Sequence, residues 1–240
     1  MKVGLAFGSS IAIDGPSTMA LCQRAEAAGF ESIWGGEHVI MPDAIGSKYP
    51  YTPDGKIPAE PETPIPDPLI WLAYAAAAAP TLRLGTCILI VPQRNPLILA
   101  KELASLDVLS GGRLDFGIGA GWMLTDYEQA GIGYDTPGTR IRRLSESVDI
   151  LRALLNGTEV PDSGEFYDIA GPLAAPLPVQ PGGIPLMLAG GKQKMLTLAG
   201  EKADIVGINP GLTAGVIDER AGRTATAEKT DEKLTWIRDG

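Results

Sequence analysis

The sequence predicts an α/β fold in which parallel strands alternate with helices. Short apolar runs alternate with longer stretches whose apolar positions recur at helical spacing. Glycine follows several of these segments, as it does at tight strand-to-helix turns and at helix ends. Parallel β-α units wound in one sense form either a barrel or a doubly wound sheet, and the pattern alone leaves both open. With 240 residues, 45% of them hydrophobic, we expect a single domain over 1–240.

Six β-α units are expected in order, each an apolar strand followed by a helix of 3.6-residue periodicity. Written as strand then helix, they are Val3–Phe7 with Ser17–Ala28, Ser32–Trp34 with Pro68–Ala79, Leu82–Val91 with Pro96–Leu109, Leu114–Ile118 with Arg140–Leu155, Pro185–Leu188 with Met195–Ala199, and Ile205–Ile208 with Ala225–Ile237. Gly29 marks the end of the first helix, and Gly111-Gly112 marks the end of the third.

Two long irregular insertions, rich in Pro and Gly, interrupt these units at 42–66 and 156–183. Loops of this length in a compact domain are usually lids or binding segments, and surface decoration is the alternative. The sequence therefore predicts that ligand contacts come partly from these two insertions.

Charge and cysteine usage exclude several partners. The chain has 20 basic and 29 acidic residues, a net charge of −9, which repels nucleic acid and anionic lipid surfaces. The most apolar later segment, Pro68–Ala79, is far shorter than the roughly 20 residues that a membrane span requires. Cys22 and Cys87 form neither a metal-type pair nor a disulfide framework, so we expect a cytoplasmic protein whose partner is a small molecule.

His38 is the only histidine, and it directly follows the second strand. Parallel α/β proteins place their sites at the carboxyl ends of strands. Imidazole exchanges protons near neutral pH, and the adjacent Glu37 is in a position to orient it. The residues therefore suggest a catalytic pair, although a lone histidine is more often an ordinary polar residue.

Two glycine-rich turns follow strands, at 117–121 and 189–192. Glycine lets the backbone approach a ligand, and the helix that follows offers unpaired N–H groups to a phosphate. Neither turn fits the Walker loop or the dinucleotide fingerprint, and such turns also occur without ligands. Four aromatic residues at strand ends or in the first insertion are expected to form a substrate pocket over a planar ring: Trp34, Tyr49, Tyr51 and Trp122.

Taken together, several motifs resemble the luciferase-like monooxygenase superfamily along most of the chain. They are Glu26 to Trp34 with Glu37-His38, Leu84-Gly85-Thr86, Asn95-Pro96, Lys101, Leu106-Asp107, Ser110 to Arg113, and Gly117 to Trp122. The segments Tyr49 to Gly55 and Asp204 to Asn209 further resemble a subfamily of probable oxidoreductases that depend on the deazaflavin coenzyme F420.

This resemblance implies a (β/α) TIM barrel of the bacterial luciferase-like type, with the cofactor ring across the C-terminal strand ends. In relatives the ring lies against a bulge in the third strand with a non-proline cis peptide, here Cys87-Ile88. It would also contact Gly119 and Ala120. The resemblance places the cofactor phosphate on three further residues, Gly190, Gly191 and Asn209.

Two features depart from the family pattern. Related deazaflavin-dependent sugar-phosphate dehydrogenases have a histidine at the position of His38 and a glutamate where this chain has Trp122, which argues against sugar-phosphate oxidation. Family barrels have eight strands, and the sequence has six β-α units, so the last two units are expected to be missing, through truncation or in a naturally short relative. Open sheet edges, together with the dimerisation common in this family, favour a homodimer.

Several functions are consistent with these residues. The leading hypothesis is an F420-dependent oxidoreductase that moves a hydride between the deazaflavin and a small organic substrate, with His38 exchanging the proton and Glu37 orienting it. The alternatives are an FMN-dependent luciferase-like monooxygenase, a non-catalytic flavin- or deazaflavin-binding protein with an incomplete barrel, and a folded fragment without a ligand.

Overall fold

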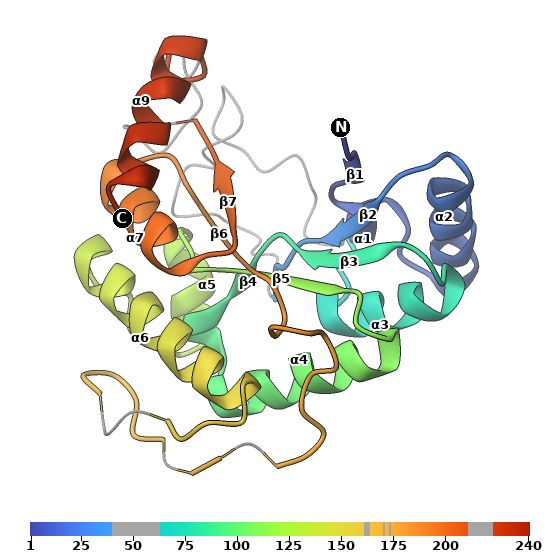
Figure 1. Cartoon of the computed structure of the whole chain (residues 1–240), viewed down its shortest axis with the longest axis horizontal. Helices are drawn as coiled ribbons and strands as arrows, with labels where there is room; N and C mark the ends of the chain where they lie inside the picture. Colours follow the sequence, from blue (N-terminus) through green and yellow to red (C-terminus); the bar gives the residue numbers. More distant parts are fainter. Residues whose placement is uncertain (40–62, 161–163, 170, 173, 211–222) are drawn as a thin grey trace.

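The fold is a curled parallel half-barrel with helices on its outer side (Figure 1). The computed structural model describes residues 1–39, 63–160, 164–169, 171–172, 174–210 and 223–240. The strands are β1 (Gly4–Leu5), β2 (Ser32–Gly35), β3 (Arg83–Thr86), β4 (Leu89–Ile90), β5 (Leu114–Gly119), β6 (Leu186–Gly190) and β7 (Ile205–Ile208). They pair in the order β1-β2-β3-β5-β6-β7, with β4 also on β5, and every pair is parallel.

The helices surround the sheet in an arc (Figure 1). They are α1 (Gly8–Ile11), α2 (Gly15–Ala27), α3 (Pro68–Ala78), the 3₁₀ turn η1 (Val91–Gln93), α4 (Pro96–Ser110), α5 (Leu124–Gln129), α6 (Pro137–Leu155), α7 (Gln193–Lys202) and α9 (Ala227–Arg238). Neighbouring helices pack in sequence order from α2 through α3 and α4 to α6. None of the described helices has the length and apolar character needed to cross a membrane.

The starts of α2, α3 and α4 are capped by side chains. Asp67 and Asn95 accept hydrogen bonds from the first backbone N–H groups of α3 and α4, and a proline stands at the first helical position of both. Asp14 and Ser17 form a reciprocal capping box at the start of α2. Because side-chain caps and proline satisfy or remove otherwise unpaired N–H groups, each helix begins at a fixed residue after its strand.

The core lies between the sheet and the helices. All six residues of β5 are buried, as expected for the central strand of a parallel sheet that is covered on both faces. Leu84, Phe116 and Leu188 from neighbouring strands are 0–1% exposed and belong to the same apolar cluster. The six strand positions of the sequence prediction are therefore confirmed, and β5 anchors the strand ends that carry the candidate site.

Several boundaries differ from the prediction for local reasons. The first strand ends at Leu5 because Phe7 adopts a left-handed backbone (φ 56°) and begins α1. The third strand, expected to be continuous to Val91, is broken between Thr86 and Leu89. Helix α6 begins at Pro137 rather than Arg140, because Thr136 caps it and proline is favoured at a first helical position.

The second insertion, 156–183, was expected to contribute to the binding site, and its described residues contradict that expectation. Asp107 of α4 accepts hydrogen bonds from the backbone of Val179 and the side chain of Gln180. Gln180 also donates to the carbonyl of Leu114, at the N-terminal end of β5. Since Val179 and Gln180 lead into the start of β6, this part of the insertion is held at the opposite end of the sheet from the candidate site.

Candidate functional site

The break in the third strand places Ile88 against β5. The Cys87–Ile88 peptide bond is cis, at the position that the resemblance implied. A Cβ atom added to Gly119 would lie 2.0 Å from Cδ1 of Ile88, so only glycine leaves room for this side chain. Thr86 links the break to β5, because its hydroxyl donates to the carbonyl of Gly117 at 2.8 Å. The proposed ring-binding residues Ile88 and Gly119 are thus direct neighbours.

Glu37 stabilises this broken strand. Its buried carboxylate accepts a hydrogen bond from the backbone N–H of Ile90 at 2.6 Å and pairs with the guanidinium of Arg94. Arg94 also pairs with Asp67 at 2.9 Å. Burial raises the pKa of the Glu37 carboxyl, and Arg94 and the Ile90 N–H oppose that rise. The expected role of Glu37 in orienting His38 needs correction, because both carboxylate oxygens are engaged with β4 and Arg94.

Asp126 is the carboxylate that lies beside His38. Its Oδ2 atom is 3.7 Å from Nδ1 of His38, and the side chains are 3% and 25% exposed. Asp126 comes from α5, which follows β5, so the pair joins the ends of β2 and β5. The sequence analysis missed Asp126, because an acidic residue in a short polar helix ordinarily indicates a solvent-facing position.

Buried polar atoms without hydrogen-bond partners gather near the C-terminal ends of the strands. In the described part of the chain, these atoms are Nδ1 of His38, both amide atoms of Gln93, Oδ1 of Asp126 and Nε of Arg140. All four residues lie on segments that follow β2, β4 or β5. Because buried polar groups nearly always have partners, a cluster of unpartnered ones indicates where ligand or water binds.

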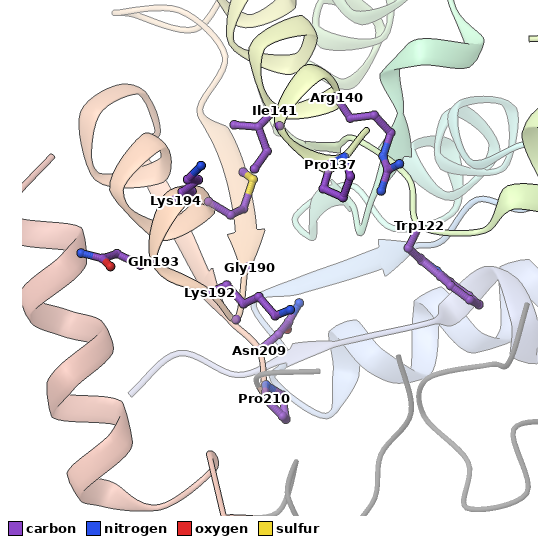
Figure 2. Close-up of a pocket in the computed structure, with 13 residues that line it drawn as sticks. Trp122, Pro137, Arg140, Ile141, Gly190, Lys192, Gln193, Lys194, Asn209 and Pro210 are labelled. Carbon is purple, nitrogen blue, oxygen red and sulfur yellow. The ribbon is translucent and has the colours of Figure 1, made fainter. Parts of the chain in front are cut away.

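A cavity of about 590 Å³ is lined by Arg140 of this set, whereas His38, Gln93 and Asp126 are not among its lining residues. Figure 2 shows Trp122, Pro137 and Arg140 on one side and Gly190, Lys192 and Asn209 on the other. Of the residues predicted for the site, Trp122, Gly190, Gly191 and Asn209 line this cavity, which brings the two glycine turns and the last strand together. The cavity volume is in the range typical of small-molecule sites.

Other predicted residues lie elsewhere. The indole of Trp34 packs over Gly85, where an added Cβ would lie 2.1 Å from the ring, and donates to Ser32 at 2.9 Å, so Trp34 does not line this cavity. Tyr49 and Tyr51, like most of the first insertion, fall outside the described residues. Ala120 accepts a hydrogen bond from the hydroxyl of Tyr127 through its carbonyl, which fixes the turn that precedes Trp122.

The Gly190–Gly191 turn has the features of a phosphate-binding turn. Helix α7 begins shortly after this turn. No side chain caps the start of the helix, so its first backbone N–H groups have no side-chain acceptor. A Cβ atom on Gly191 would lie 2.3 Å from the carbonyl oxygen of Pro210, which explains the glycine. Asn209 is held in place because its N–H donates to Gly190 and its carbonyl accepts from buried Lys233, both at 2.8 Å.

Comparison with known proteins identifies the family. The model of the family described as luciferase-like monooxygenase matches residues 6–236, so this chain belongs to that family. An uncharacterized protein of Mycobacterium tuberculosis is 35% identical over 170 residues, which cover 71% of this chain and 57% of that protein. The oxygenase component of the flavin-dependent trigonelline monooxygenase of Acinetobacter baylyi is 31% identical over 169 residues, or 70% of this chain and 41% of that protein.

Solved structures share the fold. The coenzyme F420-dependent tetrahydromethanopterin reductase of Methanopyrus kandleri superposes with a TM-score of 0.69 at 21% identity, covering 100% of this chain and 60% of that chain. The described fold is therefore the luciferase-like half-barrel that the sequence predicted, and this chain spans about three fifths of such relatives. Members of the family use either F420 or flavin, and these similarities do not select between the two cofactors.

Proposed function

We propose that this chain is a coenzyme F420-dependent oxidoreductase that moves a hydride between the deazaflavin and a small organic substrate. The observation that carries the proposal is the pair of partly buried His38 and buried Asp126, whose facing side chains each include a buried atom without a partner among the described residues. An acid-base pair at the C-terminal strand ends, next to the break that holds Ile88, is what a hydride transfer coupled to a proton transfer requires.

The residues present fit such a cofactor. Gly119 leaves room for Ile88 to lie over β5 as a flat apolar support, and the uncapped start of α7 provides N–H donors for a phosphate. When bound, the deazaflavin supplies the two-electron hydride acceptor or donor. The chain itself contributes the support, the phosphate contacts at Gly190 and Gly191, and the proton.

His38 handles the proton in this proposal. Its Nδ1 atom faces Asp126, which leaves Nε2 to take the hydroxyl proton of an alcohol during oxidation and to return it during reduction. Asp126 stabilises the imidazolium that forms and fixes the ring orientation, in the way that buried carboxylates support catalytic histidines. Trp122, on the cavity wall, limits the access of water to this reaction.

The first experiment is titration of the purified chain with F420 and, separately, with FMN, followed by cofactor fluorescence. We expect saturable binding of F420, and slow bleaching of its absorbance when a panel of small alcohols is added. Tight binding of FMN alone, with oxygen consumption by the reduced complex, would replace this proposal by a monooxygenase. Binding without turnover across the panel would favour a cofactor-binding protein.

The monooxygenase is the second candidate because one specific similarity favours it. The relative from Acinetobacter baylyi, at 31% identity, is named as a flavin-dependent monooxygenase. Oxygen consumption separates the two reactions, since the F420 reaction needs no oxygen. The two reactions also differ in their need for His38. The hydride transfer requires a group that exchanges the substrate proton in the same step, and His38 is essential only for such a reaction.

A further inference from the structure

Three cations that form no ion pair with any described residue line the cavity. They are Arg140 from the first turns of α6, and Lys192 and Lys194 from the start of α7. No carboxylate lines the cavity, and none of the three forms an ion pair within the described ranges. In a chain with a net charge of −9, such a concentration of unmatched positive charge favours a ligand with more than one acidic group.

Arg140 is held rigidly in this wall. Its guanidinium stacks over the ring of Tyr134, with 4.1 Å between its central carbon and the ring centre, and its Nη1 donates to the carbonyl of Asp135 at 2.6 Å. Tyr134 is fixed in turn, because its hydroxyl donates to the carbonyl of Trp122 at 2.7 Å. A guanidinium fixed in this way loses little conformational entropy when a ligand binds.

The free edge of Arg140 is the edge that other arginines in this protein use for carboxylates. Nε and Nη2 of Arg83 bind Asp115 at 2.9 and 2.5 Å, and those of Arg142 bind Glu165 at 3.0 and 2.8 Å. In Arg140, Nε is buried without a partner, and Nη2 contacts no acceptor among the described residues. This fork matches the two oxygens of a carboxylate.

The supporting residues link Arg140 to the proposed acid-base pair. The ring of Tyr134 packs edge-on against Tyr127 of α5, with 5.0 Å between ring centres, and Tyr127 is the immediate neighbour of Asp126. The Gly190–Gly191 turn, which precedes α7, lies across the cavity from Arg140 (Figure 2). Arg140 therefore belongs to the wall that carries Trp122, which is the substrate side of the proposed site.

We propose that Arg140 binds a carboxylate of the substrate, so that the substrate class is small organic acids such as hydroxy acids. This inference rests on the proposed oxidoreductase function for the identity of the substrate, while carboxylate binding itself is testable without turnover. The phosphate turn at Gly190–Gly191 and the lysines of α7 then serve the cofactor.

The binding test follows the side-chain Nε–Hε resonance of Arg140 by NMR, assigned by its absence in Arg140→Lys. The probes are 3-hydroxybutyrate and its uncharged analogue 2-butanol, at matched ionic strength and with cofactor present. We expect a saturable shift of this resonance with 3-hydroxybutyrate only. Calorimetric titration, which does not need the resonance, should give an affinity at least about tenfold weaker in Arg140→Lys, because the bidentate contact is lost. The matched control is Arg142→Lys, on the same helix but outside the cavity, which should bind the probe normally.

Kinetic and cofactor-binding measurements show whether the carboxylate at Arg140 belongs to the substrate or to the cofactor. If the proposal holds, Arg140→Lys raises the KM for 3-hydroxybutyrate about tenfold or more, and leaves the Kd for F420 unchanged. Weaker binding of F420, with unchanged binding of the tail-less deazaflavin, would assign Arg140 to the acidic tail of the cofactor and overturn the proposal. Absence of any resonance shift with carboxylates would also overturn it. A shift without turnover would retain the carboxylate site and reject the oxidoreductase.

Discussion

The two ends of the candidate site differ in whether their charged side chains are paired. Near β2 and β4 the charges are matched inside the protein, since Glu37, Arg94 and Asp67 pair with one another. Near β6 and α6 the cations Arg140, Lys192 and Lys194 have no acidic partner in the part that the structure describes. Paired buried charges fix the positions of the residues that carry them, whereas unpaired cations at a cavity favour the binding of an anion.

The difference is seen by comparing two arginines, Arg94 and Arg140. Both present the Nε and Nη2 edge, and in Arg94 it is filled by Glu37 of the same chain. In Arg140 the Nε atom is buried without a hydrogen-bond partner among the described residues. We infer that the first region positions the reacting groups and that the second region recognises the ligand, so substitutions in the two regions should change different quantities.

The largest effect is expected from His38→Ala. If His38 exchanges the proton, turnover should fall by about 10²- to 10⁴-fold, while the Kd for the cofactor changes by less than about twofold. The measurement is F420 reduction under saturating substrate, together with a fluorescence titration of the cofactor. A variant as active as the wild type would remove His38 from the mechanism.

Asp126→Asn provides the matched comparison, because it keeps the shape of the side chain and removes the charge beside Nδ1 of His38. We expect a smaller loss of turnover than in His38→Ala, since the imidazole remains but its protonated form loses its partner. Equal activity of Asp126→Asn and wild type would leave Asp126 with a packing role only.

The sequence predicted the matched region less completely than the fold. Strand order, helix positions and the break at Cys87–Ile88 followed from periodicity and from the family resemblance. Glu37 was expected to orient His38, and its actual partners were not expected, because the N–H of Ile90 and the Arg94 side chain come from residues 53 and 57 positions away. Such contacts depend on tertiary packing, which local pattern does not contain.

The sequence predicted the unmatched region only through two glycines, Asn209 and Trp122. Gly190, Gly191, Asn209 and Trp122 all line the cavity. From the sequence, Arg140 was only the first residue of a predicted helix, where Arg142 and Arg143 carry the same charge. In the structure Arg142 and Arg143 pair with Glu165 and Asp135. Among the described residues Arg140 has no carboxylate partner, and the pairing of a side chain is a property that the sequence alone does not contain.

An intermediate effect is expected from Glu37→Gln, which breaks the matched region. The change leaves Arg94 without its main carboxylate, and we expect the free energy of unfolding to fall by about 3 kcal/mol, at the lower end of the range for buried pairs because Asp67 still pairs with Arg94. Urea unfolding at pH 7 measures this loss. The control is Glu165→Gln in the exposed pair with Arg142, where no loss beyond error is expected. Equal losses of unfolding free energy in both variants would contradict the prediction that the buried pair contributes more to stability than the exposed pair.

The smallest effect concerns Tyr127, which connects the two regions through Ala120 and Tyr134. Burial raises the pKa of the Tyr127 phenol to about 12. The folded state then holds this proton more tightly than the unfolded state, whose tyrosine pKa is about 10. The stability from this group is therefore complete below about pH 10 and is lost as pH rises toward 12.

Tyr127→Phe isolates that loss, because all other groups titrate alike in both proteins. At pH 7 the variant should be less stable by about 1 kcal/mol, since the hydrogen bond to Ala120 is missing. Between about pH 10 and 12 the wild type should lose about 2 kcal/mol that the variant does not, so the two stabilities converge and then cross. Urea midpoints from pH 7 to 11.5 follow this difference. A constant gap would mean that the phenol is solvated in the folded state, and that the wall joining Asp126 to Arg140 is looser than its contacts indicate.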